Sequence, residues 1–471
     1  MHKLALTLFA TAGLTCAAGL NVPIERYTLA NGMRVVLSQD NAAPVVSVYV
    51  IYGVGARSEQ KGRTGFAHLF EHMMFQGSKN VAKAQHFQIV QANGGNLNGS
   101  THPDYTDYFE VLPSNKLAVG LWLESDRMRG LNITEENLKN QKEAVKQERR
   151  LNFDNQPYNT AIVDVWPQLT FKNWGNSHSL IGSFEDLNAA TVADVSEFFK
   201  THYAPNNAVL CIAGDIQIAE AKKLIETYFA DIASQPQPKG PELTEPEQTE
   251  ARSQTYKDAL AQVPALITGW PAPKRRSADY YALGMLDVLL SGGDASRLQQ
   301  DLVKGKQSVV SYEANIGWPF ASVSDYVWPG DYAVQLLFKP NFTSDQILDQ
   351  LTGEIGRIQK EGVPAKELDR ARTFFRASRY NQLMSVQSRA SLLAQYELFD
   401  HDPNLINTEL DSFLAVTPEQ IQAVASKYLT PARRSTLTIV PAPSQTETKT
   451  EAKLVSRIAA SRARAISLSL P

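Results

Sequence analysis

The two halves of this 471-residue chain repeat one pattern of strands and helices, which limits the folds open to it. The run Tyr203-Ala-Pro205 leads into a β-rich segment at 208–213, and Tyr428-Leu-Thr-Pro431 leads into a similar segment at 436–440. Such internal similarity usually reports a duplicated structural unit. Because the chain is also too long for one ordinary hydrophobic core, we expect two domains of similar fold in tandem.

Each half mixes β-rich runs with amphipathic segments, so each domain is predicted to be α+β, a sheet backed by helices. In the first half, strands are expected at 34–37, 45–52, 107–112 and 208–214, and helices at 114–129, 135–152, 191–201 and up to Phe229. In the second half, a strand at 265–269 and a helix at 279–290 repeat the strand–helix opening of the first.

Changes in composition predict the boundaries of these domains. Lys3 precedes an apolar run at 4–14, and small residues follow near Ala18, which is the pattern of a cleavable signal peptide over 1–18. A Pro-, Glu- and Gln-rich stretch at 233–250 predicts a linker. The expected domains are therefore 19–232 and 251–443, and 444–471 is expected to be a disordered tail, with a basic surface helix as the alternative.

The apolar run at 4–14 is too short to remain as a membrane anchor, so no integral membrane segment is expected after signal removal. The expected location is the periplasm of a bacterium or the medium outside it. If Cys16 leaves with the signal peptide, Cys211 is the remaining thiol and no internal disulfide forms. The net charge of −3 gives no indication of a nucleic-acid partner.

The pentapeptide His68-Leu69-Phe70-Glu71-His72 is the strongest functional signal in the chain. On a helix, positions i, i+3 and i+4 share one face, so both imidazoles and the carboxylate project together. Two imidazoles one turn apart can bind a single Zn²⁺, and the carboxylate lies close enough to take a proton from water at the ion. Apolar neighbours predict a buried helix, on which unpaired His and Glu would be costly. A satisfied pair of core histidines is the alternative.

The predicted helix at 135–152 contains the best candidate for a third ligand, since a catalytic zinc usually has three protein ligands. Thr134 is the predicted N-cap. Leu138, Val145 and Glu148 fall on one stripe, which places Glu148 on a face that otherwise points inward. An ion pair with a buried arginine is the alternative.

These features resemble peptidase family M16, which includes pitrilysin, insulin-degrading enzyme and mitochondrial processing peptidase. The family motif is H-x-x-E-H followed by a distant glutamate, and Glu148 lies 76 residues after His72. The resemblance is closest to bacterial members with two repeats per chain and covers nearly all of the mature chain. It implies one Zn²⁺ per chain, held by His68, His72 and Glu148, with Glu71 as general base. Where the family often has a supporting glutamate, this chain has Gln141.

The segment Gly94-Gly-Asn-Leu-Asn98-Gly99-Ser-Thr101 resembles the family pattern G-G-x-x-N-A-x-T. The resemblance implies an edge strand at 96–101, to which an extended peptide adds by β-augmentation. It implies substrate contacts by Asn98, Gly99 and Thr101. A glycine turn is the alternative for this segment taken alone.

The second half has no H-x-x-E-H, and it departs from the family at the residues that contact substrate. Ser291-Gly-Gly-Asp-Ala-Ser-Arg297-Leu298 matches the family's G-G-x-S-S-R-L, but the arginine and tyrosine that follow in the family are Val303 and Val310 here. Tyr312 lies two positions late. The resemblance therefore implies half of a clamshell, completed in a homodimer, or in a heterodimer whose second M16-like chain supplies Arg and Tyr. A slower enzyme that lacks this pair is the alternative.

The predicted function is that of a zinc-dependent metalloendopeptidase that hydrolyses peptides or unfolded segments. A non-catalytic, peptide-holding or structural subunit of the same family is one alternative, and all four motif residues of the family argue against it. A binding protein with a chance motif is another, and the position of Glu148 argues against that.

Overall fold

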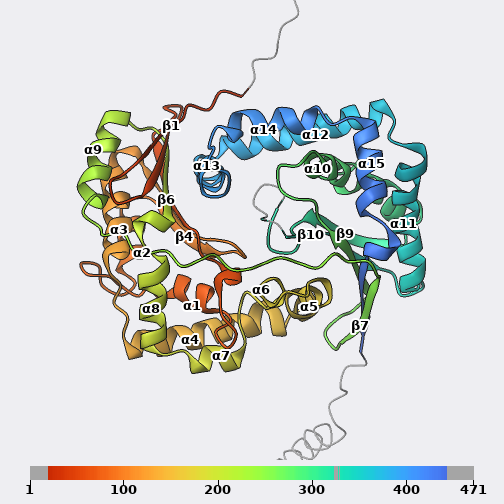
Figure 1. The fold of residues 1–471 in the computed structure, drawn as a ribbon, viewed down its shortest axis with the longest axis horizontal. Helices are drawn as coiled ribbons and strands as arrows, with labels where there is room; N and C mark the ends of the chain where they lie inside the picture. The colour runs from red at the N-terminus through yellow and green to blue at the C-terminus, as the bar shows by residue number, and fades with distance from the viewer. Residues whose placement is uncertain (1–19, 323–326, 328, 443–471) are drawn as a thin grey trace, which may run out of the picture.

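The computed structural model describes residues 20–322, 327 and 329–442, which form two α+β domains side by side (Figure 1). The predicted signal peptide at 1–18 and the predicted tail at 444–471 lie outside the described residues. Among the described residues, no helix combines the length and the hydrophobicity of a bilayer-spanning segment.

The first domain contains a six-stranded sheet in the order β1-β2-β6-β3-β5-β4. Only the β2–β6 pair is parallel. The strands are β1 Glu25–Thr28, β2 Arg34–Gln39, β3 Val45–Tyr52, β4 Asn96–Thr101, β5 Thr106–Pro113 and β6 Ala208–Gly214. The helices are α1 Phe66–Met73, α2 Gln85–Ala92, α3 Leu117–Arg129, α4 Glu135–Arg149, α5 Trp166–Thr170, α6 Trp174–Ser177, α7 Phe184–Ala189, α8 Val192–His202 and α9 Ile218–Phe229.

The second domain repeats this arrangement with a five-stranded sheet in the order β7-β11-β8-β10-β9, which confirms the predicted pair of similar α+β domains. Its strands are β7 Arg252–Asp258, β8 Ala265–Pro271, β9 Val309–Ile316, β10 Asp331–Phe338 and β11 Ser435–Pro441. Its helices are α10 Ala278–Ser291, α11 Ser344–Glu361, α12 Ala365–Met384, α13 Val386–Asp400, α14 Leu405–Leu414 and α15 Pro418–Tyr428. Residues 233–251 join the domains without forming a helix or strand.

Alternation of side chains along the strands gives the first sheet two buried faces. One face, which includes Val48 and Leu210, packs against helices of its own domain. The other face, which includes Tyr49 and Cys211, packs against Leu393 and its neighbours on α13 of the second domain. Figure 1 shows α13 lying between the two sheets.

The second sheet is covered in the same reciprocal way. Its outer face packs against α10, α11 and α15. On its other face, Ile267 and Ala333 pack against Ala161 and Trp166 of the first domain. Each domain therefore completes the hydrophobic core of the other.

Candidate active site

Helix α1 is held at its start by a turn that requires glycine. Gly65 has φ +79°, and a Cβ there would lie 2.6 Å from the carbonyl oxygen of Ile181. The buried carboxylate of Glu59 accepts hydrogen bonds from the backbone N–H groups of Gly65 (2.9 Å) and Ala67 (2.8 Å). The positive end of the helix dipole favours this carboxylate. Glu59 was not predicted from the sequence, because it lies outside the usual capping positions of the helix.

Helices α1 and α4 bring His68, His72 and Glu148 together. Glu148 Oε2 lies 3.2 Å from His72 Nε2 and 3.7 Å from His68 Nε2. The three candidate ligand atoms all lie within 4.8 Å of one another. Nitrogen and oxygen ligands about 2.0–2.2 Å from a tetrahedral Zn²⁺ lie roughly 3–4 Å apart, so this donor set fits zinc. The cluster joins residues that are 76 positions apart in the sequence.

The surroundings shift the pKa values of the three groups in different directions. Burial, with the neighbouring His72, lowers the pKa of His68 to about 4, so its imidazole is neutral near pH 7. The hydrogen bond with His72 lowers the pKa of Glu148. Burial alone would lower the pKa of His72, but its hydrogen bond with Glu148 and the charge of Glu71 outweigh burial and raise it.

Gln141 supports the His72 ring from α4. Its Oε1 atom lies 3.3 Å from His72 Nδ1. Since an amide oxygen can only accept, this contact places hydrogen on Nδ1 and leaves Nε2, which faces Glu148, as the nitrogen that would bind a metal. Gln141 therefore occupies the supporting position that a glutamate often holds in the family.

Glu71 lies beside the cluster without belonging to it. The hydroxyl of Thr101 donates a 2.7 Å hydrogen bond to Glu71 Oε2. Burial raises the pKa of this carboxyl, which suits a group that must accept and return a proton. Thr101 is the last residue of β4, so the carboxylate lies at the end of this strand.

Strand β4 occupies the edge of the first sheet, with β5 as its neighbour on one side. Its backbone polar groups on the other side are available for pairing with an extended chain. Asn98 is exposed, and Gly99 is buried against Tyr108, whose ring would lie 2.9 Å from a Cβ at position 99. Alanine, common in the family at this position, would require Tyr108 to shift.

In the second domain, the side chains of Tyr312 and Arg297 are both engaged within the domain. The hydroxyl of Tyr312 bonds with Ser296 (2.9 Å) and with the carbonyl of Ser291 (3.3 Å). Arg297 makes two 2.8 Å hydrogen bonds with the carboxylate of Glu367. Val310, on the edge strand β9, is 53% exposed.

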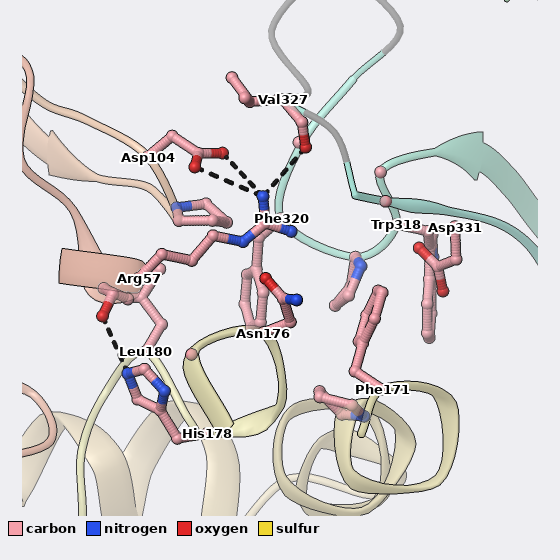
Figure 2. A pocket seen from close by; sticks show the side chains of 18 of the residues that line it. Arg57, Asp104, Phe171, Asn176, His178, Leu180, Trp318, Phe320, Val327 and Asp331 are labelled. Atoms are coloured by element: carbon pink, nitrogen blue, oxygen red, sulfur yellow. Dashed lines mark hydrogen bonds and ion pairs between the residues drawn. The ribbon is translucent and has the colours of Figure 1, made fainter. Parts of the chain in front are cut away.

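The two domains meet where the chain leaves β4. Figure 2 shows Arg57 of the first domain reaching Asp104 and the backbone carbonyl of Val327 in the second domain, the latter at 2.9 Å. A cavity of about 60 Å³ lies beside this contact, lined by Phe171 and Trp318 among others. The contact holds the second domain close to the end of β4.

A second group of potential ligands lies in the core of the first domain: His86, Glu110 and Glu124. The guanidinium of Arg127 already supplies a positive charge there, with a 2.9 Å bond to Glu124. Burial raises the pKa of Glu124 to about 8. This cluster therefore balances its charge with Arg127 and protons, and we assign no metal to it.

Comparison with known proteins agrees with this geometry. Residues 34–182 match the family model described as insulinase (peptidase family M16), and residues 189–375 match the model described as the peptidase M16 inactive domain. The chain belongs to peptidase family M16. The first match contains all of the candidate ligands, and the second lies largely in the domain without them.

Relatives named as zinc proteases span nearly the whole chain. The zinc protease PqqE of Helicobacter pylori is 27% identical over 451 residues, which cover 93% of this chain and 98% of the relative. The uncharacterized zinc protease YmxG of Bacillus subtilis is 24% identical and covers 86% of this chain and 96% of its own. The crystal structure of a protease from Helicobacter pylori has a TM-score of 0.83 at 25% identity, covering 89% of this chain and 100% of that one.

A longer structure shows the same fold. The periplasmic protease PqqL of Escherichia coli matches with a TM-score of 0.73 at 17% identity. The match covers 90% of this chain but 48% of that one. The M16 half-clamshell of this chain thus corresponds in fold to about half of the longer protein.

Proposed function

We propose that this chain is a zinc-dependent metalloendopeptidase that hydrolyses peptides or unfolded segments. The observation that carries this proposal is the convergence of His68, His72 and Glu148, with Glu71 beside them at the end of an edge strand. We assign the first three residues as ligands of one Zn²⁺ per chain. When bound, the ion supplies Lewis-acid chemistry, polarising the scissile carbonyl and making water a better nucleophile.

The remaining steps fall to residues of the chain. Glu71 takes the proton from the attacking water and delivers it to the leaving amine. The hydroxyl of Thr101 orients the Glu71 carboxylate. Strand β4 pairs with the backbone of an extended substrate along Asn98, Gly99 and Thr101, and this selects unfolded chains with little dependence on sequence.

We further propose that a second, different M16-like chain completes the site with an Arg and a Tyr. Val303 and Val310 stand at the family positions of these donors, and Tyr312 and Arg297 are engaged within the second domain. Loss of one such donor typically costs about a hundredfold or more in rate. The match to about half of a longer M16 chain supports a pair of half-clamshells. Export through residues 1–18 remains a prediction.

The test is cleavage of an internally quenched, unstructured peptide by the mature chain with zinc. Glu71→Gln is the control, since it keeps the ligands and the size of the side chain but removes the base. We expect wild-type turnover and a loss of roughly a thousandfold or more in Glu71→Gln, with unchanged zinc content. Retained activity in this variant would remove Glu71 from the mechanism.

The same assay separates the alternatives when it is repeated with an M16-like chain that carries Arg and Tyr but lacks H-x-x-E-H. Turnover only in the mixture would support a shared site. Turnover by the chain alone would make the missing pair dispensable. A zinc-loaded chain that is silent in both conditions would favour the peptide-holding subunit.

A further inference from the structure

Strand β4 is held between two different environments. Thr101 faces α1, where it bonds to Glu71. Ser100 faces the opposite side of the sheet and lies directly across from Asp107 of β5 in the antiparallel register. Because neighbouring residues of a strand point to opposite faces, a constraint on Ser100 from behind also sets the position of Thr101 in front.

Four residues form a hydrogen-bond chain behind this strand, which we call the Asp107 chain: Ser100, Asp107, Tyr49 and Ser391. The hydroxyl of Ser100 donates to Asp107 Oδ1, and the hydroxyl of Tyr49 donates to Asp107 Oδ2. Ser391 Oγ donates to the Tyr49 hydroxyl at 3.0 Å. Ser391 belongs to α13, so the chain runs from the second domain to the edge strand of the first.

The two central residues of the Asp107 chain are buried, which restricts their movement. Asp107 is 5% exposed and Tyr49 is 1% exposed. A buried carboxylate is costly unless donors satisfy it, so Asp107 favours the one arrangement that keeps Ser100 and Tyr49 in place.

A parallel contact reaches the residues that follow β4. Gln395 of α13 donates to the Tyr105 hydroxyl at 3.1 Å. The Tyr105 ring stacks on His102, with ring centroids 4.1 Å apart. Helix α13 therefore contacts the end of β4 along two routes.

We propose that Asp107 is a positioning residue, through which the docking of α13 holds β4 in the geometry that pairs with an extended substrate. The proposal rests on the proposed function, in which β4 is the substrate strand. It gives the second domain a role in substrate binding at a site to which it contributes no metal ligand.

The first test is steady-state cleavage of the quenched peptide by the zinc-loaded full chain. Asp107→Asn keeps the size of the side chain but has one acceptor oxygen in place of two. We expect KM to rise about tenfold, because one hydrogen bond that orders the strand is lost, while kcat stays within about threefold. Zinc content should not change. Ser391 lies at the far end of the Asp107 chain, so Ser391→Ala should also raise KM, but by a smaller factor.

The matched control is Ser47→Ala. Ser47 lies two residues before Tyr49 on β3, so it shares the face that α13 covers. It is fully buried, and its hydroxyl has no hydrogen-bond partner among the described residues. Its substitution should leave KM unchanged. An equal rise in KM in Ser47→Ala would assign the effect to general packing and overturn the proposal.

A second readout does not depend on activity. Amide hydrogen exchange at residues 99–101 should be about tenfold faster in Asp107→Asn, and measurably faster in Ser391→Ala, than in wild type or Ser47→Ala. If Asp107→Asn does not fold, the KM and hydrogen exchange of Ser391→Ala test the proposal in its place. Unchanged exchange and unchanged KM would overturn the proposal. A wild-type chain without turnover would contradict the proposed function instead, and the exchange measurement would still decide the role of Asp107.

Discussion

The sheets of the two domains have the same strand order, but the helix that follows the central strand carries different residues in each domain. The order β7-β11-β8-β10-β9 repeats β2-β6-β3-β5-β4, strand for strand. In the first domain, the helix that follows the central strand presents His68, Glu71 and His72. In the second, α10 fills the equivalent place with buried apolar residues, among them Leu283, Met285 and Leu286. The comparison shows that the sheet and its helix form without the polar cluster, so the fold itself does not require His68, Glu71 and His72.

The domains also differ in what they provide to each other. Helix α13 of the second domain covers the first sheet and connects to β4 through the Asp107 chain. The segment around Trp166 of the first domain covers the second sheet. The second domain thus contacts the strand beside the site, although none of its described residues belongs to the His68, His72 and Glu148 cluster.

The largest effect is expected from removing a metal ligand, which tests whether the first domain differs from the second by holding a metal. His68→Ala removes one of three ligands, so we expect zinc content to fall from about one per chain to near zero and turnover to fall roughly a thousandfold or more. Metal analysis and the quenched-peptide assay measure both. Asp287→Asn on α10 is the matched change in the second domain and should leave zinc in place. A His68→Ala chain that still holds one zinc would refute the ligand assignment.

The next effect concerns the reciprocal packing of the two domains. Leu393 on α13 is fully buried against the first sheet, so Leu393→Ala should lower the free energy of unfolding by about 3 kcal/mol. Met384, the last residue of α12, is 82% exposed, so Met384→Ala should change the free energy of unfolding by less than about 0.5 kcal/mol. Urea denaturation followed by tryptophan fluorescence and by far-UV circular dichroism tests this. Equal stability of both variants would show that α13 is not needed as a cover.

A smaller effect is expected at the support of His72. A carboxylate is a stronger acceptor than an amide, so Gln141→Glu should tighten zinc binding by about tenfold in a chelator competition. Glu143→Gln is the control on the same helix, because Glu143 bonds to Lys146 at 2.6 Å instead of to the cluster. No change in Gln141→Glu would show that the contact at 3.3 Å contributes little.

The last expected effect is the pH dependence of stability in the second domain. Burial raises the pKa of Asp331 from 3.8 to about 7, and Trp166 Nε1 donates to its carboxylate at 2.8 Å. The folded state therefore binds this proton more tightly than the unfolded state. The stabilisation is fully present below the unfolded pKa and is lost as pH rises through about 7.

Asp331→Asn removes this titration but keeps an acceptor for Trp166. Between pH 4 and pH 8, the free energy of unfolding of wild type should fall relative to the variant by about 4 kcal/mol. Denaturation curves of both proteins across this range measure the difference. A constant difference would show that Asp331 is ionised in the folded protein throughout.

Local patterns predicted most of the fold. The expected strand at 45–52 has the same bounds as β3, and the expected helix at 279–290 lies within α10. The helix expected at 135–152 ends earlier, since α4 stops at Arg149 and a wider turn follows. Leu151, which lies in this wider turn, is 53% exposed.

The sequence by itself determined which residues share a helix face, that the domain is duplicated, and that the metal motif belongs to the first half alone. These properties follow from spacing, which local backbone geometry converts directly into direction. Only the tertiary structure decided that Glu148 meets both histidines, that Glu59 anchors the start of α1, and that α13 reaches β4 through Asp107. A periodic pattern marks a face to be buried but does not specify its partner. That partner depends on contacts between residues far apart in the chain, which the packing of both domains selects together.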